Sequence, residues 1–292
     1  MVQRIAVVPI GAVLLACASA LAQGEAPKAD DPGAAAVLDR SDAKWTISVE
    51  PAAWFVGANG RLHMPQSGPS ASPGKVEIQN LNLDNPRFVP FAEVNVRRGD
   101  WRFAARGFLY DAEKDASGNF GQIGDVTFDT GDTLRSELHF ASYELEGAYR
   151  VMGSPQNVGK DGIAAIDSKF DIVGGLRLYD VDMTVRNVTT GPAQADASGW
   201  YPAPLVGAKL SMDLWRDVTI DLQVTLGGLP FGSRTSYSGD IIAGFMYRPT
   251  AHVGVQIGYR SLFFGMEDGS GDGKFSFNGA MQGLYGGLVF RF

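Results

Sequence analysis

The chain has 292 residues and a formal net charge of −7, with 37 Gly, 17 Phe, 9 Tyr and 5 Trp. An acidic balance without a Lys/Arg-rich run argues against nucleic acid as a partner. No apolar stretch reaches the length of about 18 residues that a membrane-spanning helix needs, so a membrane protein of this composition is expected to cross by strands.

The first 22 residues have the pattern of a secretory signal peptide. Arg4 precedes an apolar run from Ile5 to Leu15, and small residues follow up to an A-x-A-like site at Ala20–Ala22. The alternative is lipoprotein processing, with acylation at Cys17. With cleavage after Ala22, the mature chain has no cysteine and hence no disulfide.

Residues 23–43 lack periodicity and predict a flexible periplasmic lead. From Lys44 onward the dominant signal is the alternation of apolar and polar residues, which is typical of half-buried strands. Counting these runs predicts ten antiparallel strands, near residues 44–57, 86–97, 101–112, 133–152, 168–186, 200–215, 217–230, 236–248, 252–266 and 276–292. Merging weak runs gives eight strands, and splitting the longest gives twelve.

The run from Val218 to Gly227 is the clearest case of alternation. Five apolar residues oppose five small or polar ones there, as a wall between lipid and a polar lumen requires. Short connections such as Arg97–Asp100 alternate with long polar ones such as Ala58–Asn85 and Ala112–Asp132, although the connection from Gly153 to Ser168 is a longer exception. Short periplasmic turns and long outer loops are typical of transmembrane barrels, with both termini in the periplasm.

The segment Val76–Asp84, in the first long connection, has two readings. Its apolar residues suit an inward fold that narrows the lumen, and they suit equally an extension of the second strand above the membrane.

The last strand alternates up to the final residue. Leu284, Gly286, Leu288, Phe290 and Phe292 share one face, and Tyr285, Gly287, Val289 and Arg291 share the other. Over residues 44–292 the chain resembles the small outer-membrane β-barrel proteins of Gram-negative bacteria, whose last strand ends in Phe and is read by the barrel-assembly machinery. The resemblance implies an all-β, closed antiparallel barrel in the outer membrane, in contact with lipid and lipopolysaccharide, with Phe290 and Phe292 as the assembly signal.

Charged residues at inward positions are the candidate functional residues, since ionisable groups at membrane depth face a lumen and pair there. They are predicted to line either a charged channel or a salt-bridge network that fills the barrel. The lumen-lining set is Glu93, Arg102, Arg106, Glu144, Glu146, Arg150, Arg177, Lys209, Asp221, Asp240 and Arg260.

Catalysis, a metal site and a cofactor are not expected. His139 and Ser142 stand three residues apart on a predicted strand, which places them on opposite faces, and His63 and His252 lie in a loop and beside a turn. The Asp268–Gly273 segment resembles a calcium loop, but Gly279 replaces the bidentate Glu at its twelfth position, so a hairpin tip is favoured.

Family resemblance therefore favours porin-like passive diffusion of small solutes. The alternative is a structural or adhesive barrel with a plugged lumen and partner-binding outer loops. The oligomeric state and the solute are open.

Overall fold

The computed structural model describes residues 44–67, 74–158, 164–191, 193–214 and 217–292 of the chain. All of these belong to one compact unit, Arg40–Phe292. The predicted signal peptide (1–22), the predicted lead (23–43) and the acylation alternative at Cys17 lie outside the described residues.

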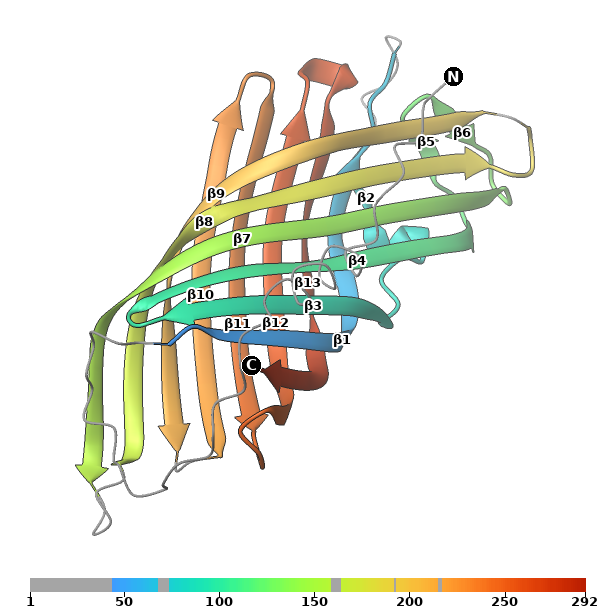
Figure 1. Ribbon diagram of the computed structural model, residues 1–292. Coiled ribbons are helices and arrows are strands. Elements are labelled where there is room, and N and C mark those ends of the chain that lie inside the picture. The colour runs from blue at the N-terminus through green and yellow to red at the C-terminus, as the bar shows by residue number, and fades with distance from the viewer. Residues whose placement is uncertain (1–43, 68–73, 159–163, 192, 215–216) are drawn as a thin grey trace. The chain divides into compact units, whose positions relative to one another are not determined.

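Ten long antiparallel strands form one sheet (Figure 1). They are β1 (Thr46–His63), β3 (Arg87–Arg98), β4 (Trp101–Ser117), β7 (Thr133–Val158), β8 (Ala164–Asn187), β9 (Gln194–Leu214), β10 (Val218–Phe231), β11 (Arg234–Tyr247), β12 (Val253–Asp268) and β13 (Phe275–Arg291). Each strand pairs with the next along the chain, so every connection is a hairpin.

The sheet closes on itself through β13 and β1. Their register runs from Ser48 opposite Arg291 to His63 opposite Ser276, and the final residue extends the seam, because Phe292 and Ile47 exchange backbone hydrogen bonds of 2.8 and 3.2 Å. Closure satisfies the backbone groups that lipid cannot. The predicted closed antiparallel barrel of ten strands is confirmed.

The outer face of the barrel is an apolar belt. Val253, Val255, Ile257 and Tyr259 on β12 are each more than 40% exposed, and Gly254 and Arg260 of the same strand point inward. Trp45, Trp101 and Tyr149 form an aromatic group at one edge of this belt. A closed sheet with an apolar outer face and paired charges inside is a transmembrane barrel, and its location is the outer membrane.

No helix among the described residues is long and apolar enough to span a membrane.

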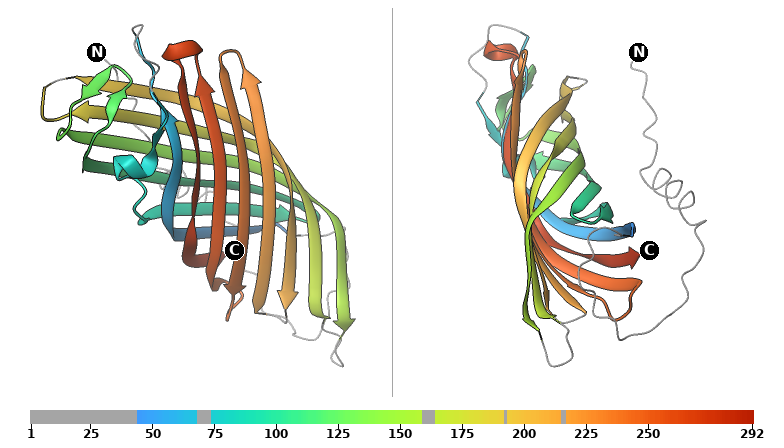
Figure 2. Two further views of the ribbon diagram at one scale, coloured as in Figure 1. Left: turned by 180° about the vertical axis from the view of Figure 1, so that it is seen from behind. Right: turned by 60° about the vertical axis from the view of Figure 1, so that its left-hand side comes forward.

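Strand lengths differ around the barrel (Figures 1 and 2). β7 and β8 have 26 and 24 residues, whereas β10 and β11 have 14 each. The long connections between β1 and β3 and between β4 and β7 lie at one end of the barrel and assign it to the outside, so the end with the turn Gly99–Asp100 is periplasmic. At that end Val158 pairs with Ala164, so much of the connection expected over 153–168 is strand. A register shift between Arg150 and Met152 adjusts β7 near this end.

The long outer connections contain structure that the sequence interpretation treated as loop. The first includes β2 (Val76–Glu77) and the 3₁₀ turn η2 (Ile78–Leu81), and the second includes the hairpin of β5 (Gly121–Ile123) and β6 (Val126–Phe128). Another 3₁₀ turn, η3 (Gly271–Gly273), ends the β12–β13 hairpin. The elements of the first two connections bury apolar side chains that would otherwise be exposed to water.

Candidate functional site

The barrel interior consists of three regions along its axis: an aromatic core toward the outside, two layers of ion pairs at the centre, and a polar vestibule that reaches the periplasmic end. Inward positions of successive strands supply all three, because side chains alternate between the two faces of a strand. The structure places all eleven predicted lumen residues on this inward surface.

The aromatic core is built by inward side chains of β1, β4, β7, β12 and β13. Phe140 packs against Phe264 with ring centroids 4.8 Å apart, and Trp54 meets Phe108 edge-on at 5.1 Å. Phe277 contacts Phe264 at 4.9 Å. These five rings are at most 1% exposed. A water-filled lumen would wet them, so the barrel is packed at this level.

Segment 76–84 covers this core from the outside. Ile78, Leu81 and Leu83 are fully buried, the hydroxyl of Tyr110 donates to the carbonyl of Leu83 at 2.8 Å, and the hydroxyl of Ser136 donates to that of Leu81 at 3.0 Å. Tyr110 and Ser136 are inward residues of β4 and β7. Of the two readings of this segment, the structure adopts the inward fold.

The β5–β6 hairpin packs on the same core. Its own side chains Ile123, Val126 and Phe128 are buried in the cluster that includes Trp54 and Phe140. Its turn residue Asp125 accepts hydrogen bonds from the backbone N–H and the hydroxyl of Ser67, at 2.8 and 2.7 Å. We call η2, the β5–β6 hairpin and Met64–Ser67 the cap.

The upper ion-pair layer crosses the barrel. Arg177 donates to Oε2 of Glu144 at 2.6 Å and to Oδ2 of Asp240 at 2.7 Å. Arg260 donates to the same Asp240 oxygen at 2.6 Å. The Arg260 guanidinium also lies 5.3–5.4 Å from the ring centroids of Trp54, Phe91 and Phe108, which joins this layer to the aromatic core.

The lower layer is built around Glu146. Arg102 and Arg106 both approach its Oε1, at 2.6 and 2.7 Å, and Gln223 donates to its Oε2 at 2.8 Å. Glu93 lies 3.5 Å from Arg106 and 3.8 Å from Arg102. The two layers together hold four arginines and four carboxylates, so they carry no net charge. They form the floor of the vestibule.

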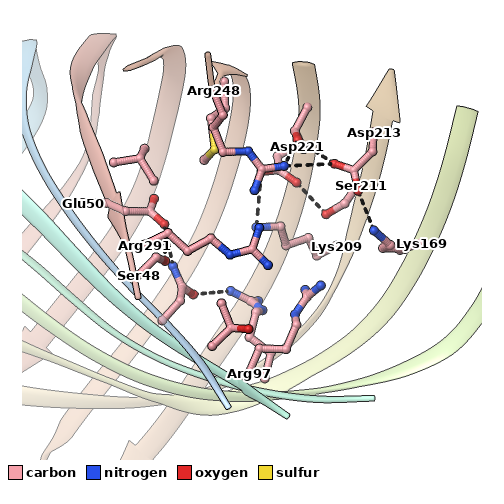
Figure 3. Close-up of a pocket in the computed structure, with 16 residues that line it drawn as sticks. Ser48, Glu50, Arg97, Lys169, Lys209, Ser211, Asp213, Asp221, Arg248 and Arg291 are labelled. Carbon is pink, nitrogen blue, oxygen red and sulfur yellow. Dashed lines mark hydrogen bonds and ion pairs between the residues drawn. The ribbon is translucent and has the colours of Figure 1, made fainter. Parts of the chain in front are cut away.

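The vestibule is a cavity of about 170 Å³ below this floor (Figure 3). Predicted lumen residues Lys209 and Asp221 line it, 3.6 Å apart. The sequence interpretation left out other charged residues in or beside it, namely Glu50, Arg97, Lys169, Asp171 and Arg291. Asp171 and predicted Arg150 form an ion pair of 3.6 Å, and Asp171 shares the inward parity of Arg177, a signal that was available in the sequence.

The histidines lie apart from this interior. His139 is partly exposed on the outer wall, 2.5 Å from Asp111, whereas Ser142 is buried and faces inward, so the two lie on opposite faces as expected. His63 and His252 contact the carbonyls of Lys274 and Arg291. Asp268 accepts a 2.9 Å hydrogen bond from Arg234 at the tip of a hairpin. Across the described ranges, no group of three His, Cys, Asp or Glu side chains is placed to hold a metal ion.

In comparisons with known proteins, no family model and no curated protein matches this chain. Among solved structures, the chain is similar to the Escherichia coli outer membrane protease OmpT, with 10% identity, a TM-score of 0.46, and coverage of 87% of this chain and 100% of that one. It is also similar to Neisserial surface protein A, with 15% identity, a TM-score of 0.33, and coverage of 84% and 97%.

A third similar structure is the Ralstonia pickettii toluene transporter TbuX, with 8% identity, a TM-score of 0.29, and coverage of 86% and 89%. Function is therefore argued from the interior of this chain alone.

Proposed function

We propose that this chain is a sealed outer-membrane barrel and that its ordered cap binds partners outside the cell. The observation that carries the proposal is the aromatic core, whose rings are at most 1% exposed at the level of Trp54, Phe108 and Phe140. A packed lumen gives solutes no path. This is the plugged-barrel alternative of the sequence interpretation.

The order of the cap supports a role in contact with partners. Besides the bonds between Ser67 and Asp125, Asn187 donates from its side chain to the carbonyl of Thr127 at 3.2 Å, and Gln66 donates from its backbone N–H to the carbonyl of Asp272 at 2.9 Å. Loops held in one geometry present a fixed surface, and binding to it costs little ordering entropy.

Porin-like diffusion is the second candidate, and one observation favours it. The periplasmic half of the lumen is polar, and its vestibule already forms half of a path. Diffusion through the whole barrel requires the aromatic core and the cap to move aside.

Conductance in planar bilayers separates the two functions. We expect no discrete steps from the mature barrel after folding is verified by its heat-modifiable migration. The double variant Phe140→Ala, Phe264→Ala is the positive control, because it removes two facing rings from the core. Its matched control is Phe231→Ala, Phe263→Ala, on the exposed outer face. Regular steps from the unmodified protein that change with Arg102→Gln, Arg106→Gln would overturn the sealed barrel and support diffusion.

Attachment assays test the role of the cap. Cells that display the protein are compared with cells that display a variant in which residues 121–128 are replaced by a Gly/Ser linker, at equal surface levels. We expect weaker attachment to glass and to other cells for the variant. Equal attachment would count against partner binding by the cap.

A further inference from the structure

Six cationic side chains and three carboxylates line the vestibule: Arg97, Arg102, Lys169, Lys209, Arg248 and Arg291 with Glu50, Asp213 and Asp221. Three of the cations have further partners, because Arg102 pairs with Glu146 in the floor, Arg97 with Asp171 at 3.5 Å and Lys169 with Asp167 at 2.9 Å. The cations that remain to attract anions from the periplasm are Lys209, Arg248 and Arg291.

The pairing of these charges shows which cationic donors remain available. Asp213 is shared between Lys169 at 2.5 Å and Arg248 at 3.8 Å. Asp221 faces Lys209 at 3.6 Å and also accepts a 2.5 Å hydrogen bond from the hydroxyl of Ser211. Long ion pairs and a shared carboxylate leave Arg248 and Lys209 with donors to spare.

Arg291 has no carboxylate within ion-pair distance among the residues that the structure describes. Arg248 and Lys209 line the same cavity, and Figure 3 shows the Arg291 side chain extending into it. Cations that share a half-enclosed cavity repel one another, and an anion bound there reduces the repulsion.

We propose that the vestibule binds a phosphate group at Arg248, Arg291 and Lys209. Two guanidinium groups supply forked N–H donors that match the oxygens of phosphate, and the lysine supplies a point charge. The hydroxyl of Thr46 on the same wall is a further donor, whereas the hydroxyls of Ser48 and Thr219 donate to Glu50 and Asp213. The cavity volume of about 170 Å³ admits a phosphate with a few waters and excludes large solutes.

The group arrives from the periplasm, either as free phosphate or as the terminal phosphate of a small phosphomonoester. The neutral floor of Arg102, Arg106, Glu93 and Glu146 prevents it from going further. Binding does not depend on whether the core above the floor is sealed, so the conductance result and the binding result are independent.

Isothermal titration of the folded full-length mature barrel in a neutral detergent at low salt tests the proposal, with inorganic phosphate, glycerol phosphate and chloride as probes. We expect saturable binding of one equivalent of phosphate, weaker at higher salt, and no saturable binding of chloride. Saturation by inorganic phosphate alone identifies the free ion as the ligand, and tighter binding of glycerol phosphate identifies a phosphomonoester. Failure of the folded protein to bind either probe, or equal binding of chloride, would overturn the proposal.

Single substitutions test which residues bind the phosphate. Arg248→Gln and Lys209→Gln are each expected to lower phosphate affinity at least tenfold. Arg291→Gln is expected to do the same, but it adjoins the final residue, so the other two variants keep the test valid if it assembles poorly. Arg234→Gln, at the outer end of β11, is the control and is expected to bind normally. Unchanged affinity in Arg248→Gln and Lys209→Gln would place the phosphate elsewhere and refute the assignment.

Discussion

Arg177 and Asp240 are joined by a 2.7 Å hydrogen bond between Nη2 and Oδ2, although they lie on strands that do not touch in the sheet. β9 and β10 separate β8 from β11, so the bond crosses the lumen. Arg177 also donates to Glu144 on β7. One fully buried guanidinium therefore links separate parts of the wall, in addition to the backbone ladders between neighbouring strands.

Removal of this link should destabilise the barrel strongly. Arg177→Met leaves Glu144 buried without its ion-pair partner, and we expect the free energy of unfolding to fall by about 3–5 kcal/mol. Urea unfolding of the refolded protein, followed by tryptophan fluorescence, measures it. Arg135→Met breaks an exposed pair with Asp115 on the outer wall and should cost less than about 1 kcal/mol. The double variant Arg177→Met, Glu144→Gln restores neutrality and should recover part of the loss; a double variant no more stable than the single would contradict this electrostatic cause.

The seam between β1 and β13 has no room for a side chain at Gly283, so a substitution there should hinder closure of the barrel. A Cβ there would lie 1.8 Å from the carbonyl oxygen of Phe55, whereas at Gly286 on the same strand the nearest atom, the oxygen of Gln256, is 3.6 Å away. We expect Gly283→Ala to lower the yield of the closed, heat-modifiable form severalfold and Gly286→Ala to refold normally. Electrophoresis of unheated samples measures both, and equal yields would show that the seam can adjust.

The contact between Ser67 and Asp125 should make the cap sensitive to acid. Two hydrogen bonds from Ser67 lower the pKa of the Asp125 carboxyl below its usual value, and the residue lies in the outer hairpin, beyond the membrane-spanning strands. Because the folded-state pKa is lowered, the stabilisation is complete above the ordinary Asp value of about 3.9 and is lost as the pH falls through the lower, folded-state value. Hydrogen-exchange protection of β5 and β6 should decrease over this acidic range. Asp125→Asn should weaken protection at neutral pH and remove this step, and a step that persists in the variant would assign it to another group.

The final residue offers a test of the assembly signal that separates it from stability. The Phe292 side chain is 71% exposed, and its backbone, not its ring, makes the hydrogen bonds to Ile47. We therefore expect Phe292→Ala to change the free energy of unfolding in vitro by less than about 1 kcal/mol and to reduce the amount assembled in the outer membrane of cells severalfold. Normal assembly in cells would count against the predicted role of this residue.

The strands could be predicted from the sequence wherever one face of a strand contacts lipid and the other faces a polar lumen. On β10 the faces are unambiguous, because Leu222 and Val224 face lipid and Gln223 and Thr225 face inward. The inward charges followed from the same parity, because a buried carboxylate such as Glu144 can exist at this depth only beside a cation. Local alternation is enough for both inferences.

The aromatic core was not predicted, because alternation fails where both faces are apolar. Phe108 is followed by Leu109 and Tyr110, and Phe263 is followed by Phe264. In such runs the polarity of the residues does not show which face of the strand points into the lumen. They do indicate a strand that is apolar on both sides, a signal that points to a filled barrel. The inward fold of Ile78 and Leu81 depends on that filling and on contacts with distant strands, which no local pattern contains.

The unequal strand lengths determine how far the barrel extends beyond the membrane. The ladder between β7 and β8 runs from Val158 and Ala164 at the periplasmic end to Leu134 and Asn187 at the outer end, with one register shift near Arg150. Two strands of 26 and 24 residues at about 3.3 Å per residue make this hairpin far longer than the apolar band of about 25 Å. The two ends of the hairpin therefore extend past the apolar band, where the ladder continues in water without support from lipid.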